Sequence, residues 1–280
     1  MHVRSLCLAC SLALILIATP VRAQRADDLM DQVGEWVHEF VEQFANVVAE
    51  EDYVPNQVYQ SPRLRSDYLL VRYPGSSSTW QTFRDVVAVN GSSLRNQPER
   101  LSKLFVEPFE SAVARANAIT KHSTEYISSL SDPLLCIALL QRQYQPRFRY
   151  TLGDRDEGHG AGVRRIKFEE RATPTILRQS NGHDLPTHGT AWAVEGTGRI
   201  VRTELHIGEA GRYARTVILT TTFTMDEALK AYVPATMQEG FTLRDAAGER
   251  YGVLLALPAI HGQHPGNHRR TEAVASESVR

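Results

Sequence analysis

VRTELHI at residues 201–207 and VILTTTF at residues 217–223 show the pattern that decides the fold. In both segments the odd-numbered positions are mainly apolar, and the even-numbered positions are mainly polar. A period of two is typical of a β-strand in a sheet that buries one face and leaves the other in water. The same alternation recurs through residues 147–255, which predicts one large antiparallel sheet.

Glycine-containing turns separate the predicted strands. Residues 196–198 read GTG and residues 208–211 read GEAG, both typical of hairpin turns. Further strand-like segments lie at 52–60, 64–73, 80–89, 233–243 and 250–257. This makes about 9 to 11 strands in all. A sheet of that size is expected to twist and curl.

An amphipathic helix is predicted before the strands. Apolar residues recur at spacings of three and four from Leu29 to Val48, and Asp27 and Asp28 are available to cap the first turn. We expect this helix to end near Asp52 and to pack its wide apolar stripe against the sheet.

The middle of the chain predicts further helices. Residues 99–129 favour one or two helices broken near Pro108, and residues 133–143 favour an almost wholly apolar helix capped by Asp132. A helix that is apolar on most sides must be buried on most sides. The predicted fold class is therefore α+β, a large curled antiparallel sheet wrapped around two to four α-helices.

The first 23 residues are typical of a secretion signal. Arg4 precedes an apolar run at 6–18, and residues 21–23, VRA, suit a signal peptidase. The run is too short for a permanent transmembrane anchor, so we expect a periplasmic or secreted protein. Cys10 leaves a lipoprotein signal open as an alternative.

Residues 24–260 are expected to form a single domain, because no Pro-, Ser- or Gly-rich linker divides them, and the polar residues 261–280 are expected to be disordered. Loss of residues 1–23 lowers Lys plus Arg from 31 to 29 against 32 Asp plus Glu. The resulting net charge of about −3 gives no basic stripe for nucleic acid. Cys136 is then the one remaining cysteine, and its apolar neighbours favour a buried thiol without a disulfide partner.

Pro258 interrupts the last predicted strand, because proline is not expected inside a central strand. One hypothesis is that residues 257–280 reflect a shifted reading frame. An intact frame on resequencing the gene would reject it.

No catalytic signature is found in the sequence. His159, His183 and His188 lie in Gly- and Pro-rich segments without a His-Glu-x-x-His helix, so solvated histidines are favoured over a zinc site. Residues 158–162 are rich in glycine but lack the Gly-Lys-Ser/Thr ending of a P-loop. We expect no enzymatic activity and no cofactor, and a secreted metal-dependent hydrolase is an alternative.

The layout resembles that of the LolA-like superfamily. Residues 190–194, TAWAV, turn at 196–198 into RIVRTEL at 199–205, and YVPATM at 232–237 leads to a final strand pair. This order is similar to that of uncharacterised secreted proteins of the superfamily, which includes periplasmic lipoprotein carriers and envelope-stress sensors. The resemblance implies an unclosed β-barrel around helices that binds acyl chains or a lipidated protein.

The expected function is therefore non-enzymatic binding of a lipid acyl chain or a lipidated protein in the apolar concave face of a half-barrel. Plain core packing is the alternative for each side chain, and an envelope structural or sensor module that binds another protein is the alternative function. The oligomeric state and the identity of the ligand stay open. The residues expected to line the cavity are Phe148, Ile166, Phe168, Trp192, Leu205, Val217, Leu219 and Phe223.

Overall fold

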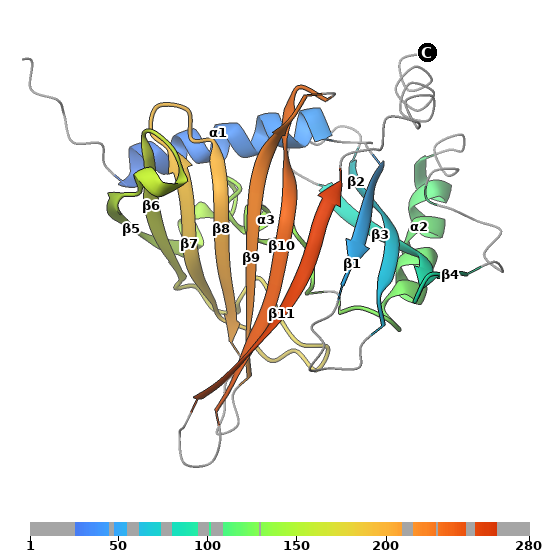
Figure 1. Ribbon diagram of the computed structural model, residues 1–280. Coiled ribbons are helices and arrows are strands. Elements are labelled where there is room, and N and C mark those ends of the chain that lie inside the picture. The colour runs from blue at the N-terminus through green and yellow to red at the C-terminus, as the bar shows by residue number, and fades with distance from the viewer. Residues whose placement is uncertain are drawn as a thin grey trace, which may run out of the picture.

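The computed structural model describes residues 26–44, 48–54, 62–73, 80–94, 101, 109–128, 130–208, 215–227, 229–244 and 250–261. Within these ranges, eleven strands form one sheet in the order β4-β3-β2-β1-β11-β10-β9-β8-β7-β6-β5 (Figure 1). The sheet curls, and the predicted α+β class with a large curled antiparallel sheet is confirmed. The predicted signal sequence and nearly all of the predicted tail lie outside the described residues.

Two groups of strands meet in the middle of the sheet. The last strand, β11, lies between β10 and β1, so the end of the chain joins the early strands to the later meander. The β1–β11 seam is short, with only the pairs Glu50–His261 and Glu51–Ile260 in register. The strands are β1 (Val48–Tyr53), β2 (Leu64–Arg72), β3 (Trp80–Val89), β4 (Ser92–Ser93), β5 (Phe148–Arg155), β6 (Val163–Glu170), β7 (Thr187–Val194), β8 (Ile200–Gly208), β9 (Arg215–Asp226), β10 (Ala231–Arg244) and β11 (Arg250–His261).

Helix α1 (Ala26–Phe44) crosses one end of the curled sheet (Figure 1) and contacts β2, β5 and β10. Its apolar stripe is buried along its whole length. The Phe40 ring stacks on Phe44 with centroids 5.3 Å apart and meets Phe223 of β9 edge-on at 6.4 Å. These contacts anchor the helix to the strands because aromatic rings bury large apolar areas with a defined geometry.

The prediction that the first helix continues to Asp52 is wrong, because Val48–Tyr53 forms β1. The apolar period of three and four still places Val48 on the helical stripe, so local pattern alone favours a helix there. All six residues of β1 pair with β2, and this pairing satisfies the backbone while alternating side chains become buried. Tertiary pairing therefore overrides the local helical pattern.

The other two helices lie on opposite faces of the sheet. Helix α2 (Phe109–Ser123) packs on the outer face of β2 and β3, where Leu69, Phe83 and Ile119 belong to a small separate core. Helix α3 (Leu135–Leu139) lies on the concave side and is shorter than the predicted 133–143. The amide of the Gln145 side chain donates to the carbonyl of Leu140, which satisfies a backbone group just beyond the helix.

Pro258 lies inside β11, so the prediction that it cannot occupy a central strand is wrong. The β10–β11 register shifts here, since Thr236 pairs with Ala259 whereas Gln238 pairs with Ala256. The extra residue on β11 forms a bulge, and a proline is tolerated at a bulge because one ladder hydrogen bond is absent there. The hypothesis of a shifted reading frame over residues 257–280 stays a prediction, to be checked by resequencing the gene.

The predicted hairpin turn at 196–198 is confirmed between β7 and β8, and it docks on α1. The backbone N–H of Gly196 donates to the side-chain carbonyl of Gln32 at 3.0 Å. Gly198 has a φ of +67°, and a Cβ on it would lie 2.1 Å from the carbonyl carbon of Gln32 and 2.4 Å from the nitrogen of Val33. Only glycine allows the hairpin to approach the helix backbone this closely.

Gly198→Ala is expected to destabilise the fold more than Gly196→Ala, as measured by urea unfolding. Both glycines have positive φ, but a Cβ on Gly196 would meet nothing within 4 Å. Gly196→Ala should therefore cost only the conformational strain, about 1 kcal/mol, whereas Gly198→Ala should cost about 2 kcal/mol more because the α1 backbone cannot move aside. Equal losses would contradict the docking of the turn on α1.

Candidate ligand-binding site

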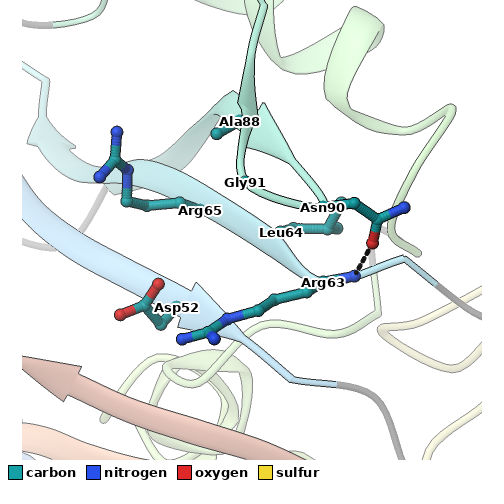
Figure 2. Close-up of a pocket in the computed structure, with 7 residues that line it drawn as sticks. All are labelled: Asp52, Arg63, Leu64, Arg65, Ala88, Asn90 and Gly91. Atoms are coloured by element: carbon teal, nitrogen blue, oxygen red, sulfur yellow. Dashed lines mark hydrogen bonds between the residues drawn. The ribbon is translucent and has the colours of Figure 1, made fainter.

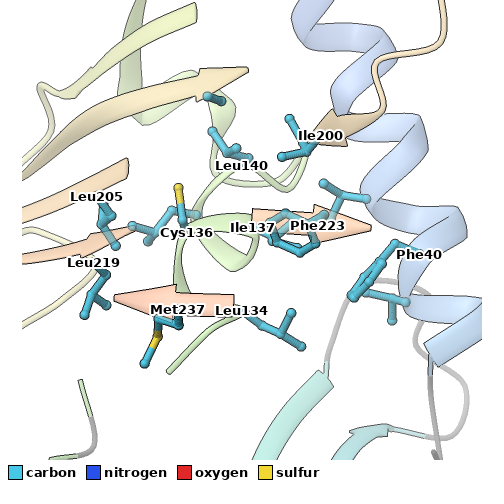
Figure 3. Close-up of a cluster of buried hydrophobic side chains, with 14 of the residues drawn as sticks. Phe40, Leu134, Cys136, Ile137, Leu140, Ile200, Leu205, Leu219, Phe223 and Met237 are labelled. Atoms are coloured by element: carbon cyan, nitrogen blue, oxygen red, sulfur yellow. The ribbon is translucent and has the colours of Figure 1, made fainter. Parts of the chain in front are cut away.

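The concave face of the sheet carries a continuous apolar core (Figure 3). Of the residues predicted to line a cavity, seven face this core from β5, β6, β8 and β9. Six of them are buried and Val217 is half-buried. The seven are Phe148, Ile166, Phe168, Leu205, Val217, Leu219 and Phe223. The alternation in the sequence therefore identified the inward face of these strands correctly.

The prediction that Trp192 lines the concave face is wrong. Its neighbours Ala191 and Ala193 are fully buried in the concave core, so Trp192 points to the opposite, convex face. There its indole N–H donates to Asp156 at 2.9 Å, and its ring lies 5.5 Å from the ring of His159. The bulk of the side chain suggested an interior position, but two small alanines face the helices because α3 and the β7–β8 region pack closely.

Helix α3 and the residues beside it occupy the centre of the concave face (Figure 3). Leu134, Ile137 and Leu140 have no exposed surface, and Leu139 has 1%. Cys136 is 3% exposed, and burial raises the pKa of its thiol to about 12. In this state the α3 segment fills the space that a ligand of the concave face would need.

Polar contacts made by Asp132 hold the start of the α3 segment against β2 and β3. Its carboxylate accepts hydrogen bonds from the Tyr68 hydroxyl at 2.7 Å and the Thr82 hydroxyl at 2.5 Å, and also from the backbone N–H of Leu134 at 2.8 Å. Burial and the neighbouring Asp132 carboxylate raise the pKa of Tyr68 well above its ordinary value, so this phenol stays a donor. The prediction that Asp132 is the helix cap is wrong, because Leu134 holds the N-cap position of α3 without a side-chain cap bond, and the Asp132 carboxylate is instead a tertiary anchor.

Ser131 extends this anchor to β10 and to a buried ion pair. Its hydroxyl donates to Glu239 at 2.5 Å, and its carbonyl accepts from Arg84 at 2.7 Å. The Arg84 guanidinium also makes a two-pronged contact with Glu51, at 2.6 and 2.8 Å. Burial opposes the charge on Arg84, but the Glu51 carboxylate outweighs it and raises the pKa of Arg84. We call Glu51, Arg84, Ser131, Asp132 and Glu239 the polar latch.

None of the polar latch residues was predicted as a site. The available signal was the Arg84-Asp85 pair inside the apolar strand segment 83–88, where a charge has no place unless it finds a buried partner. The partners of Arg84 come from β1 and from the loop before α3, at sequence separations of 33 residues for Glu51 and 47 residues for Ser131. A pattern in one segment cannot reveal such partners.

Arg84→Met is expected to lower the free energy of unfolding by about 3–5 kcal/mol, because it leaves Glu51 as an uncompensated buried carboxylate. The matched control is Arg142→Met, which removes an ion pair with Glu35 of the same 2.8 Å length between half-exposed side chains. The control should lose about 1 kcal/mol or less. Urea denaturation measures both, and a comparable loss in the two variants would contradict a buried latch.

Away from its apolar contact with α2, the convex face carries many polar side chains and has hollows of its own. One of about 480 Å³ lies at the ends of β1, β2 and β3 (Figure 2) and is lined by Asp52, Arg63, Arg65 and Asn90, among others. The Asn90 side-chain oxygen accepts a hydrogen bond from the backbone N–H of Arg63 at 2.9 Å, and this bond connects the β3–β4 turn to the start of β2. This hollow is open and charged and is therefore unsuited to an apolar chain.

The histidines weighed as metal ligands are dispersed in the structure. His159 lies beside Asp156 at 3.1 Å, His183 is exposed in a loop, and the ring of His188 stacks on that of His206 with centroids 4.8 Å apart. Among the residues that the structure describes, no three His, Cys, Asp or Glu side chains are grouped so that they would hold a metal ion.

No family model, no curated protein and no solved structure matches this chain. The resemblance to the LolA-like superfamily thus stays a prediction from the sequence. Within the described ranges, no helix is long and apolar enough to cross a membrane.

Proposed function

We propose that this protein is a periplasmic or secreted, non-enzymatic binding protein that takes up a lipid acyl chain, free or attached to a protein, in the concave face of its half-barrel. One observation carries the proposal: the centre of an extended apolar face is covered by one short apolar segment, and the start of that segment is held by polar contacts rather than by a long helix. Such a segment can leave without unravelling the sheet.

The free-energy cost of displacing the α3 segment and the gain from burying an acyl chain in its place support this proposal. Each fully buried leucine or isoleucine contributes about 1.5–3 kcal/mol, so exposing Leu134, Ile137, Leu139 and Leu140 costs about 6–12 kcal/mol. An acyl chain with about 14 methylenes gains about 0.8 kcal/mol for each one buried, or about 11 kcal/mol. The two quantities are comparable, so the polar latch decides which occupant the concave face holds.

Cys136 provides a reporter for this exchange. In protein expressed from Gln24 it is the only cysteine, and its buried thiol with a pKa of about 12 should react slowly with a disulfide reagent. Palmitate is expected to accelerate the labelling because it displaces α3 into solvent. Asp132→Asn is expected to accelerate labelling about tenfold without ligand, since the three hydrogen bonds that this carboxylate accepts are weakened.

Asp154→Asn is the matched control, because this carboxylate lies on β5 with 94% of its side chain exposed, far from the polar latch. It should label at the original rate. The dependence of the labelling rate on urea concentration separates the two ways in which Cys136 can become exposed. Displacement of α3 alone exposes little surface, so the labelling rate should depend only weakly on urea, whereas global unfolding should give a steep dependence. Absence of fatty-acid binding, or binding that leaves Cys136 protected, would reject the proposal.

The filled interior favours one other function, an envelope structural or sensor module that binds another protein. In that case α3 is a permanent part of the core. Mass spectrometry of an organic extract would show no lipid, and a stoichiometric protein partner would be recovered from native envelope extract.

A further inference from the structure

A second hollow of about 580 Å³ lies on the convex face over β5, β6, β7 and β8. Thr151, Lys167 and Thr190 lie side by side in one row across three strands, and His188 and His206 pair in the next row. All five line the hollow together with Arg149. Hydroxyl, ammonium, imidazole and guanidinium donors from four strands thus converge on one depression.

The acids near this hollow are already engaged. Glu169 accepts from Arg149 at 2.6 Å and from Arg171 at 2.7 Å, and these bonds lower the pKa of Glu169. Glu204 lies 2.9 Å from the ring nitrogen of His206, and this bond, against partial burial, lowers the pKa of Glu204. Both carboxylates are therefore charged and occupied, so neither is a free acceptor for a ligand.

Lys167, unlike these two carboxylates, has no partner among the described residues. Its ammonium is exposed and makes no hydrogen bond or ion pair with any residue that the structure describes. The three cations Arg149, Lys167 and Arg171 outnumber the two carboxylates Glu169 and Glu204 by one charge before either histidine is protonated. The unused groups of the hollow are thus donors and positive charge.

The stacked histidines add a dependence on protons. Partial burial and the ring of His206 lower the pKa of His188, although Glu169 and Glu204 oppose the shift. An anion seated over the rings favours the charged form of His188, so its binding takes up a proton and tightens as the pH falls from about 8 to about 5.5. The charged groups that face the pair are Arg149 from β5, Lys167 and Glu169 from β6, and Glu204 from β8.

We propose that this hollow binds a tetrahedral oxyanion of the phosphate-ester class, held by Lys167, His188 and His206 with the hydroxyls of Thr151 and Thr190. Three or more donors around one hollow match the several acceptor oxygens of such an anion. The site lies on the face of the sheet opposite to the apolar interior, so it does not depend on acyl-chain binding.

The experiment is a titration of the folded protein, followed by the imidazole signals of His188 and His206 in ¹H–¹⁵N NMR. Sodium sulfate is the first probe because it stays a dianion across the pH range, so any change in affinity reports the protein. Sulfate should shift both signals, and it should bind more tightly at about pH 5.5 than at about pH 8. Lys167→Gln should raise the apparent Kd about tenfold.

Lys121→Gln is the matched control, because it removes one exposed lysine from α2, on another part of the molecule. It should bind sulfate as the original protein does. Ionic strength is held constant with sodium chloride, so that general screening does not contribute.

Two further probes identify the source of the phosphate ester. Vesicles of phosphatidylcholine with phosphatidylglycerol should sediment the protein, and Lys167→Gln should abolish this, if the natural ligand is a lipid headgroup. Glycerol phosphate should shift the histidine signals without sedimentation on vesicles if the ligand is a soluble ester. No response to any probe, or responses that Lys167→Gln and Lys121→Gln change equally, would overturn the proposal.

Discussion

An open sheet with an apolar concave face must cover that face, and this requirement organises the whole molecule. The described inner faces of β1 to β3 and of β5 to β10 form one core with α1 and α3, and the apolar stripe of α1 covers part of this face. The β7–β8 turn packs directly on the α1 backbone at Gly198. The sheet and its inner helices therefore stabilise each other, because neither surface is stable in water alone.

The two helices that cover the concave face are held in different ways. Helix α1 is held by a long apolar stripe, whereas the five-residue α3 is preceded by Ser131 and Asp132, whose partners lie on β2, β3 and β10. A buried ion pair such as Arg84–Glu51 contributes little net stability, since its attraction largely offsets the cost of removing both charges from water. Its geometry instead defines where the carbonyl of Ser131 must lie. We therefore interpret the polar latch as a positioning device for the α3 segment.

Successive residues of a strand point to opposite faces of the sheet, so the apolar and the polar side chains lie on different faces. On β6 and β8, Phe168 and Leu205 point into the core, while their neighbours Lys167 and Glu204 point outward. The convex side carries histidines, threonines and charged residues in cross-strand rows. The acyl chain and the anion that we propose as ligands would therefore not compete, because they would meet opposite faces of the same strands.

The sequence by itself determined the fold class, the positions of most strands and the inward orientation of seven of the eight residues predicted to face the core, since a period of two identifies a strand face without knowledge of its neighbours. The predictions from the sequence were wrong where contacts with residues distant in the sequence determine the local structure. Val48–Tyr53 is a strand because β2 and β11 pair with it, Trp192 faces outward because small alanines are needed beneath the helices, and Pro258 is accommodated by a bulge against β10. Only the tertiary structure brought Glu51, Arg84, Ser131 and Glu239 together, because contacts between residues distant in sequence leave no periodic trace in any one segment.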